Sequence, residues 1–213
     1  MKTALIAGAT GLVGKQCLYK LLENPNYDSV YALVRKPLEI KHLKLKQIVF
    51  DYQNFAVLDI IWEVTDVYCC LGTTMKKAGT KAAFYEVDFT FVLNLAAYFA
   101  KKSTPNFLLI SAIGADANSS IFYSKVKGEI ETAISKLDYK GIFIFRPSFL
   151  MGNRDETRTG EKIGVAVAAL VSPLLFGNAK KYRPIHAAKV ANGMIERALS
   201  GNEGVFVIES DRI

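Results

Sequence analysis

Short apolar runs alternate with longer amphipathic stretches along most of this chain. The runs are almost continuously apolar, as in strands that are buried on both faces of a parallel sheet. The stretches between them repeat apolar residues at the spacing of one helix face. This alternation predicts an α/β fold of the Rossmann type, a doubly wound parallel sheet with helices on both faces. The expected strands span residues 4–7, 30–34, 48–50, 66–71, 107–111, 141–146 and 204–208.

Helices are expected between these strands. The first begins at Leu12 directly after a glycine-rich turn. The others are expected at residues 55–64, about 80–102, 121–137 and 187–199. Their apolar residues recur every three or four positions, which is typical of helices that pack on a sheet.

The alternation loosens after Pro147, where we expect a charged loop at 153–162 and an apolar helix at 163–176. That helix is too short to cross a bilayer, so no integral membrane segment is expected. We interpret residues 151–213 as a small substrate cap with the last strand. Residues 1–150 are the expected nucleotide-binding core of a single domain of 213 residues.

The glycine-rich turn contains Gly8, Ala9, Thr10, Gly11, Leu12, Val13 and Gly14. Gly8 allows a sharp turn, Gly11 lets the backbone approach a pyrophosphate, and Gly14 lets the helix pack close to the sheet. The start of the helix then offers unpaired N–H groups to phosphates. We therefore expect residues 8–13 to bind a dinucleotide. A purely structural tight turn is the alternative interpretation.

Two cations follow the second expected strand. Arg35 lies where an NAD-binding unit usually places an acidic residue for the ribose hydroxyls. A cation at this position suits the 2′-phosphate of NADP instead, and Lys36 adds a second positive charge. The two residues predict NADP(H) as the cofactor, with an exposed arginine at a strand end as the alternative.

Tyr123 and Lys127 are four residues apart in a predicted helix, so they share one face. A free tyrosine has a pKa of about 10 and is a poor acid–base group at neutral pH. A nearby ammonium stabilises the phenolate and lowers that pKa. Ser111 ends the preceding strand and is placed to hydrogen-bond the same substrate oxygen. The three residues predict a catalytic set, although tyrosine and lysine at this spacing also form ordinary surface pairs.

The charge and the cysteine content of the chain indicate which kinds of partner to expect. The net charge of +7 fits either an anionic partner, such as a phosphate-bearing cofactor, or a lysine-rich solvated surface. No basic helix has the spacing of a nucleic-acid motif, so no nucleic acid is expected. Cys17, Cys69 and Cys70 lack zinc-site spacing, so no metal is expected. We expect them to be buried free thiols in a reducing cytoplasm.

Taken together, these motifs resemble those of the atypical short-chain dehydrogenases/reductases. More narrowly, the chain resembles the Tat-interacting-protein-type oxidoreductases and their bacterial relatives over nearly its whole length. The matching motifs are GATGLVG at 8–14, LGTT at 71–74, KKAG at 76–79, VD at 87–88, SAIGAD at 111–116, YSKVK at 123–127 and RP at 146–147.

The resemblance implies a Rossmann fold in which Ser111 polarises a carbonyl, Tyr123 transfers its proton and Lys127 holds the nicotinamide ribose. It implies further NADP contacts from Arg35, Leu71, Gly72 and Thr73. The fourth strand ends without the Asn-Asn-Ala-Gly sequence of the better-known short-chain enzymes. Their asparagine-mediated proton relay is therefore not transferred to this chain.

Three functions fit these features. The first is an NADP-dependent oxidoreductase that reduces a carbonyl of a small molecule through the Ser-Tyr-Lys set. The second is an NADPH-loaded sensor or interaction protein without turnover, which requires a protein partner. The third is a nucleotide-sugar epimerase, which ranks last because only residues 147–213 follow the sixth strand. The chain is expected to be a monomer or a homodimer.

Overall fold

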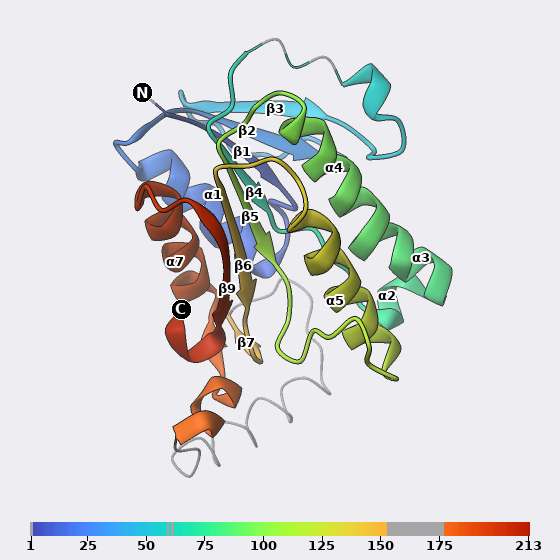
Figure 1. Ribbon diagram of the computed structural model, residues 1–213. Helices are drawn as coiled ribbons and strands as arrows, with labels where there is room; N and C mark the ends of the chain where they lie inside the picture. The colour runs from blue at the N-terminus through green and yellow to red at the C-terminus, as the bar shows by residue number, and fades with distance from the viewer. Residues whose placement is uncertain (1, 59, 61, 153–176) are drawn as a thin grey trace.

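A parallel sheet of seven strands forms the centre of the molecule (Figure 1). The computed structural model describes residues 2–58, 60, 62–152 and 177–213. The strand order is β3-β2-β1-β4-β5-β6-β9, and all of these pairs are parallel. The bounds are β1 Lys2–Ala7, β2 Tyr27–Val34, β3 Leu45–Val49, β4 Asp66–Cys69, β5 Asn106–Ile110, β6 Gly141–Arg146 and β9 Gly204–Glu209. The predicted doubly wound parallel fold is confirmed.

Helices cover both faces of this sheet (Figure 1). α1 (Leu12–Glu23) and α7 (Ala187–Leu199) lie together on one face, and α4 (Phe91–Ala100) and α5 (Phe122–Ile134) lie on the other. The shorter elements are α2 Met75–Ala78, α3 Lys81–Tyr85, a π-helical turn Glu86–Thr90, 3-10 turns at Phe55–Val57, Gly177–Tyr182 and Ser210–Arg212, and a small parallel pair of β7 Leu150–Met151 and β8 Ile185–His186. None of the helices in the described part is long and apolar enough to cross a membrane.

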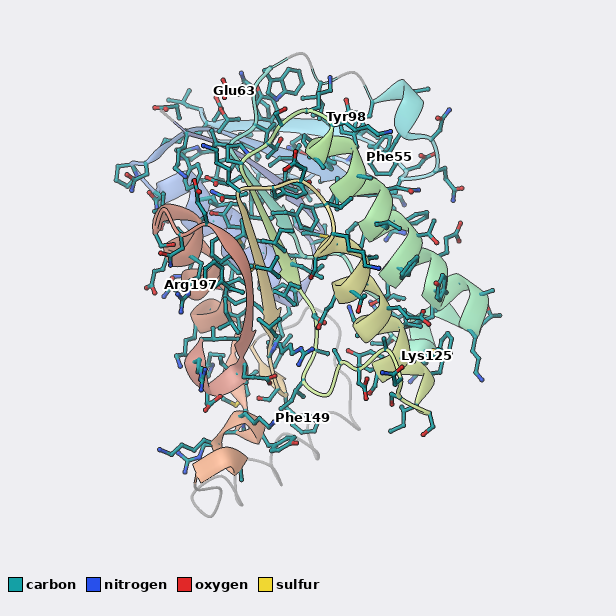
Figure 2. The ribbon with its side chains drawn as sticks, in the orientation of Figure 1. Phe55, Glu63, Tyr98, Lys125, Phe149 and Arg197 are labelled. Carbon is teal, nitrogen blue, oxygen red and sulfur yellow. The ribbon has the colours of Figure 1, made fainter. Side chains whose placement is uncertain are left out.

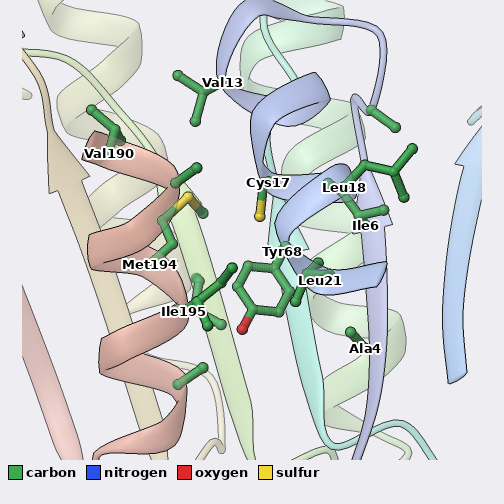
Figure 3. Close-up of a cluster of buried hydrophobic side chains, with 14 of the residues drawn as sticks. Ala4, Ile6, Val13, Cys17, Leu18, Leu21, Tyr68, Val190, Met194 and Ile195 are labelled. Atoms are coloured by element: carbon green, nitrogen blue, oxygen red, sulfur yellow. The ribbon is translucent and has the colours of Figure 1, made fainter. Parts of the chain in front are cut away.

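Two apolar clusters, one on each face, explain why the strands read as continuous apolar runs. Along β1, Ala4 and Ile6 belong to the first cluster, and Leu5 and Ala7 belong to the second. The first cluster fills the space between the sheet and the paired helices α1 and α7 (Figure 3). Its labelled members are Ala4, Ile6, Val13, Cys17, Leu18, Leu21, Tyr68, Val190, Met194 and Ile195.

The helix expected at residues 55–64 is wrong, because among the described residues of this segment (55–58, 60 and 62–64) only Phe55–Val57 is helical, as a single 3-10 turn. Beyond this turn, described backbone groups of Leu58 and Ile60 bond to side chains of the neighbouring helical region. Tyr98 Oη donates to the Leu58 carbonyl and accepts from the Ile60 N–H, and Lys102 Nζ donates to the Ile60 carbonyl over 2.8 Å. Tertiary contacts thus replace the helical hydrogen bonds that the apolar pattern suggested.

The helix expected at about 80–102 is present, but it is not regular. α3 continues into the π-helical turn Glu86–Thr90, and α4 follows directly. A π turn inserts one extra residue and is frequent at functional sites. The loop expected at 153–162 and the helix expected at 163–176 lie outside the described residues.

Candidate active site

The carboxyl ends of the central strands surround a pocket of about 500 Å³. It opens where the strand order reverses between β1 and β4, the point at which doubly wound sheets bind their ligands. Three chain segments line it: residues 10–16 at the start of α1, residues 70–74 after β4, and a group that includes Ser111, Tyr123 and Lys127. A volume of this size is typical of a small-molecule or cofactor site.

The glycine turn is shaped by close backbone contacts. Gly8 has a φ of 83°, and a Cβ there would lie 2.3 Å from the Cys70 carbonyl oxygen. A Cβ on Gly14 would lie 2.1 Å from the Gly8 carbonyl oxygen. Gly11 precedes α1 and provides no side-chain cap for the first helical N–H groups. A bound anion can accept from these groups, so the turn fits a phosphate at the start of α1.

The predicted cofactor residues divide into three groups. Thr10, Gly11, Leu12, Val13, Leu71, Gly72, Thr73, Tyr123 and Lys127 line the pocket. Gly8 and Ala9 lie below its lining and shape the turn. Arg35 and Lys36 follow β2 as exposed side chains outside the pocket, beside the strand that carries the turn.

Ser111, Tyr123 and Lys127 all line the pocket, so the structure brings the predicted catalytic set together. Ser111 follows β5 and is buried, and Lys127 on α5 is only 5% exposed. Tyr123 is 37% exposed and packs its ring on Phe84, with 5.6 Å between ring centroids. Lys125, between them in sequence, lies on the side of α5 away from the sheet (Figure 2).

Asp88 completes this group and was not predicted as a site residue. It is 1% exposed, and its Oδ1 lies 2.8 Å from Lys127 Nζ in an ion pair. Its Oδ2 accepts the Thr73 N–H over 2.8 Å. Burial alone would lower the pKa of Lys127, but the charges of Asp88 and Tyr123 outweigh it, and the pKa is raised. Asp88 therefore keeps Lys127 charged and ties it to the segment after β4.

A sequence signal for Asp88 did exist. It is an acidic residue within the apolar stripe of the 80–102 helix, between Phe84 and Phe91. In a regular helix it would be one more polar position among others. It lies in the π-helical turn Glu86–Thr90, and the apolar spacing does not predict its contacts with Lys127 and Thr73.

α5 approaches the segment after Ser111 because residue 128 is a glycine. A Cβ at Gly128 would lie 2.1 Å from the Ala117 nitrogen and 2.2 Å from the Asp116 carbonyl carbon. We expect Gly128→Ala to lower the free energy of unfolding by about 3 kcal/mol, because rigid backbone must move.

Gly193→Ala in α7 is the matched control for this change. Its Cβ would meet the Ile213 Cγ2 methyl at 3.0 Å, and a side chain can move aside. The gain in helix propensity then offsets the contact, and stability should change by less than about 1 kcal/mol. Chemical denaturation compares the two variants, and equal effects would contradict the close approach of α5.

The fold and the glycine turn at the reversal of strand order define a Rossmann-type α/β protein. The chain belongs to the NAD dependent epimerase/dehydratase family, whose model matches residues 4–211. Protein HTATIP2 of Rattus norvegicus is 35% identical over 164 residues, which cover 75% of this chain and 67% of that protein. This similarity confirms the narrower resemblance that the sequence motifs indicated.

Other relatives match almost end to end. The mitochondrial protein FMP52 of Saccharomyces cerevisiae is 30% identical over 226 residues, which cover 98% of this chain and 94% of that protein. FMP52 of Eremothecium gossypii is 29% identical and covers 99% of this chain and 95% of its own. The cytoplasmic location expected from the cysteines is contradicted by these mitochondrial relatives. Cys17 and Cys69 are buried by packing, so their free thiols do not indicate in which cellular compartment the protein is located.

Solved structures share the fold at low identity. MoeE5 in complex with UDP-glucose and NAD has a TM-score of 0.73 at 13% identity, covering 97% of this chain and 75% of its own. The UDP-glucose 4-epimerase of Thermotoga maritima, solved with UDP-glucose, has a TM-score of 0.71 at 18% identity, covering 99% and 77%. About a quarter of each of these longer chains has no counterpart here.

Proposed function

We propose that this protein is an NADP(H)-dependent oxidoreductase that reduces a carbonyl group of a small molecule. The observation that carries the proposal is one pocket with the glycine turn on one side and Ser111, Tyr123 and Lys127 on the other. The names of the family and of MoeE5 in complex with NAD support a nicotinamide dinucleotide as cofactor. When bound, this cofactor supplies a hydride.

Tyr123 acts as the proton donor in this proposal. When hydride reaches the carbonyl carbon, the C=O electron pair moves onto the oxygen, and that oxygen takes the proton of the Tyr123 hydroxyl. The phenolate that remains is stabilised by the ammonium of Lys127, which Asp88 holds in its charged form. Lys127 and Ser111 are almost completely buried, so water is kept away from the reacting oxygen on their side.

The preference for NADP(H) over NAD(H) rests on Arg35 and Lys36. Both are exposed at the carboxyl end of β2, next to the strand that leads into the glycine turn, where a ribose 2′-phosphate is expected. We expect Arg35→Ala to weaken NADPH binding about tenfold and to leave NADH binding unchanged, because a charge-assisted contact to the phosphate is lost.

Calorimetric titration of both nucleotides measures this difference. Lys41→Ala is the matched control, since it removes another exposed cation, six residues further along the sequence. If Arg35→Ala lowered the affinities for NADPH and for NADH by the same factor, a contact of Arg35 with the 2′-phosphate would be ruled out.

A nucleotide-sugar epimerase is the second candidate, favoured by the family to which the chain belongs. Against it, the sugar-nucleotide enzymes that share the fold are longer, and this chain covers 75–77% of those compared above. Binding of UDP-glucose to the purified protein, measured by the same titration, would rank the epimerase ahead of the reductase. A protein that binds NADPH but reduces no member of a broad carbonyl panel would instead be a sensor.

A further inference from the structure

A buried carboxylate lies behind Ser111. The Ser111 hydroxyl donates its hydrogen bond to Glu131 Oε1. Both residues are nearly inaccessible, at 4% and 5% exposure, but only Ser111 lines the pocket. Glu131 therefore contacts the predicted catalytic serine from the side opposite to the substrate space.

Arg146 forms an ion pair with Glu131. Its Nε lies 3.1 Å from each Glu131 oxygen, and its Nη2 lies 2.6 Å from Oε2. These hydrogen bonds are the main reason that the pKa of Arg146 is raised. Glu209 accepts from the same guanidinium at 3.1 Å, on the side of Nη1. A carboxylate fixed in this way can only accept hydrogen bonds.

The single hydroxyl hydrogen of Ser111 is thus already used. A hydrogen bond to a charged acceptor is about twice as strong as one to a neutral acceptor, so a neutral carbonyl in the pocket does not take this hydrogen from Glu131. What Ser111 presents to the pocket is its oxygen lone pairs. It can accept a hydrogen bond from a substrate hydroxyl, but it does not donate one to a substrate carbonyl.

Tyr123 has the opposite polarity, since its hydroxyl is a donor to the carbonyl in the proposed reaction. Tyr123, Lys127 and Glu131 are spaced at four-residue intervals on α5 and share one face. Ser111, bonded to Glu131, lies against this same face. The pocket is therefore lined by both a donor and an acceptor.

We propose that Glu131 determines specificity, and that the site takes a carbonyl compound that also carries a hydroxyl group. The carbonyl oxygen accepts from Tyr123, and the hydroxyl donates to Ser111. Reduction converts such a compound to a diol, with NADPH as the hydride donor and the Tyr123 proton replaced from solvent. This inference rests on the proposed function for the reaction, but its recognition step is testable without turnover.

Hydroxyacetone and methoxyacetone are the probes, because they share the ketone and only the first can donate a hydrogen bond. Their dissociation constants are measured by ligand-observed NMR in the complex with NADP⁺, in which no reduction occurs. We expect the wild-type protein to favour hydroxyacetone about tenfold. A ratio near one, or no detectable binding of either probe, overturns the proposal.

Glu131→Gln tests the role of the carboxylate, because its amide can donate to Ser111 and free the serine hydrogen. The preference should fall to about one in this variant. Glu129→Gln, two residues earlier on α5 and outside the pocket, should keep it. If Glu131→Gln does not fold, Ser111→Ala removes the acceptor without touching Arg146 and should abolish the preference as well. Retained preference in Glu131→Gln or Ser111→Ala contradicts the assignment.

Kinetics separate this inference from the proposed function. With NADPH, the ratio of kcat/KM for the two ketones should follow the ratio of their affinities. If neither ketone is reduced while the binding preference and its loss in Glu131→Gln persist, the reductase proposal fails and the role of Glu131 stands.

Discussion

Tyr123→Phe is expected to lower turnover about 10³-fold, which is a typical contribution of a general acid. Phenylalanine keeps the ring that packs on Phe84 but removes the hydroxyl proton that the proposal assigns to the carbonyl oxygen. NADPH affinity should be nearly unchanged, because the phosphates are expected at the glycine turn. Steady-state oxidation of NADPH with a panel of aldehydes and ketones measures turnover, and titration with NADPH measures the affinity.

Tyr19→Phe is the control for this variant. Tyr19 is an exposed residue of α1 that does not line the pocket, and the same hydroxyl is lost there. Its turnover should equal that of the wild-type protein. Wild-type turnover in Tyr123→Phe would contradict the assignment of Tyr123 as the acid.

Asp88→Ala is expected to lower the free energy of unfolding by about 3–5 kcal/mol, the usual cost of removing one partner of a buried ion pair. The change leaves the ammonium of Lys127 buried at 5% exposure without its carboxylate, and it leaves the Thr73 N–H without its acceptor. Glu86→Ala is the control, because Glu86 is an exposed acidic residue of the same π-helical turn. Urea denaturation at neutral pH measures the free energy of unfolding of both variants. A similar decrease in Asp88→Ala and Glu86→Ala would contradict the role given to Asp88.

The same pair predicts a pH dependence. In the wild-type protein the folded-state pKa of Lys127 lies above its ordinary value of 10.5. The stabilisation from the pair is therefore fully present below pH 10.5 and is lost as the pH rises through the folded-state pKa. In Asp88→Ala burial dominates and the pKa falls, so the variant should lose stability as the pH is lowered from 10.5. Parallel stability curves for the two proteins would contradict this account.

The sequence allowed the sheet to be predicted because its five inner strands are buried on both faces. β1 and β6 read as uninterrupted apolar runs for this reason. β3 was expected at 48–50 but spans Leu45–Val49. It is an edge strand, and its solvated positions carry polar residues such as Lys46 that hide the pattern. The failed helix at 55–64 has a different cause, the side-chain contacts from Tyr98 and Lys102 described above.

The candidate site was predictable where local motifs define it. The glycine turn and the spacing of Tyr123 and Lys127 are visible in the sequence, and Ser111 follows from the end of a strand. Asp88 and Glu131 were missed because their roles depend on partners far away in the chain. Asp88 acquires its role through Lys127 and Thr73, and Glu131 acquires its role through Ser111 and Arg146.

The central claim, that this pocket holds NADP(H), is tested most directly by calorimetric titration of the wild-type protein with NADPH and with NADH. We predict saturable binding of one NADPH per chain, with NADPH bound more tightly than NADH. Absence of binding for both nucleotides would contradict the account, because the glycine turn would then be a purely structural feature and the reductase proposal would fall with it.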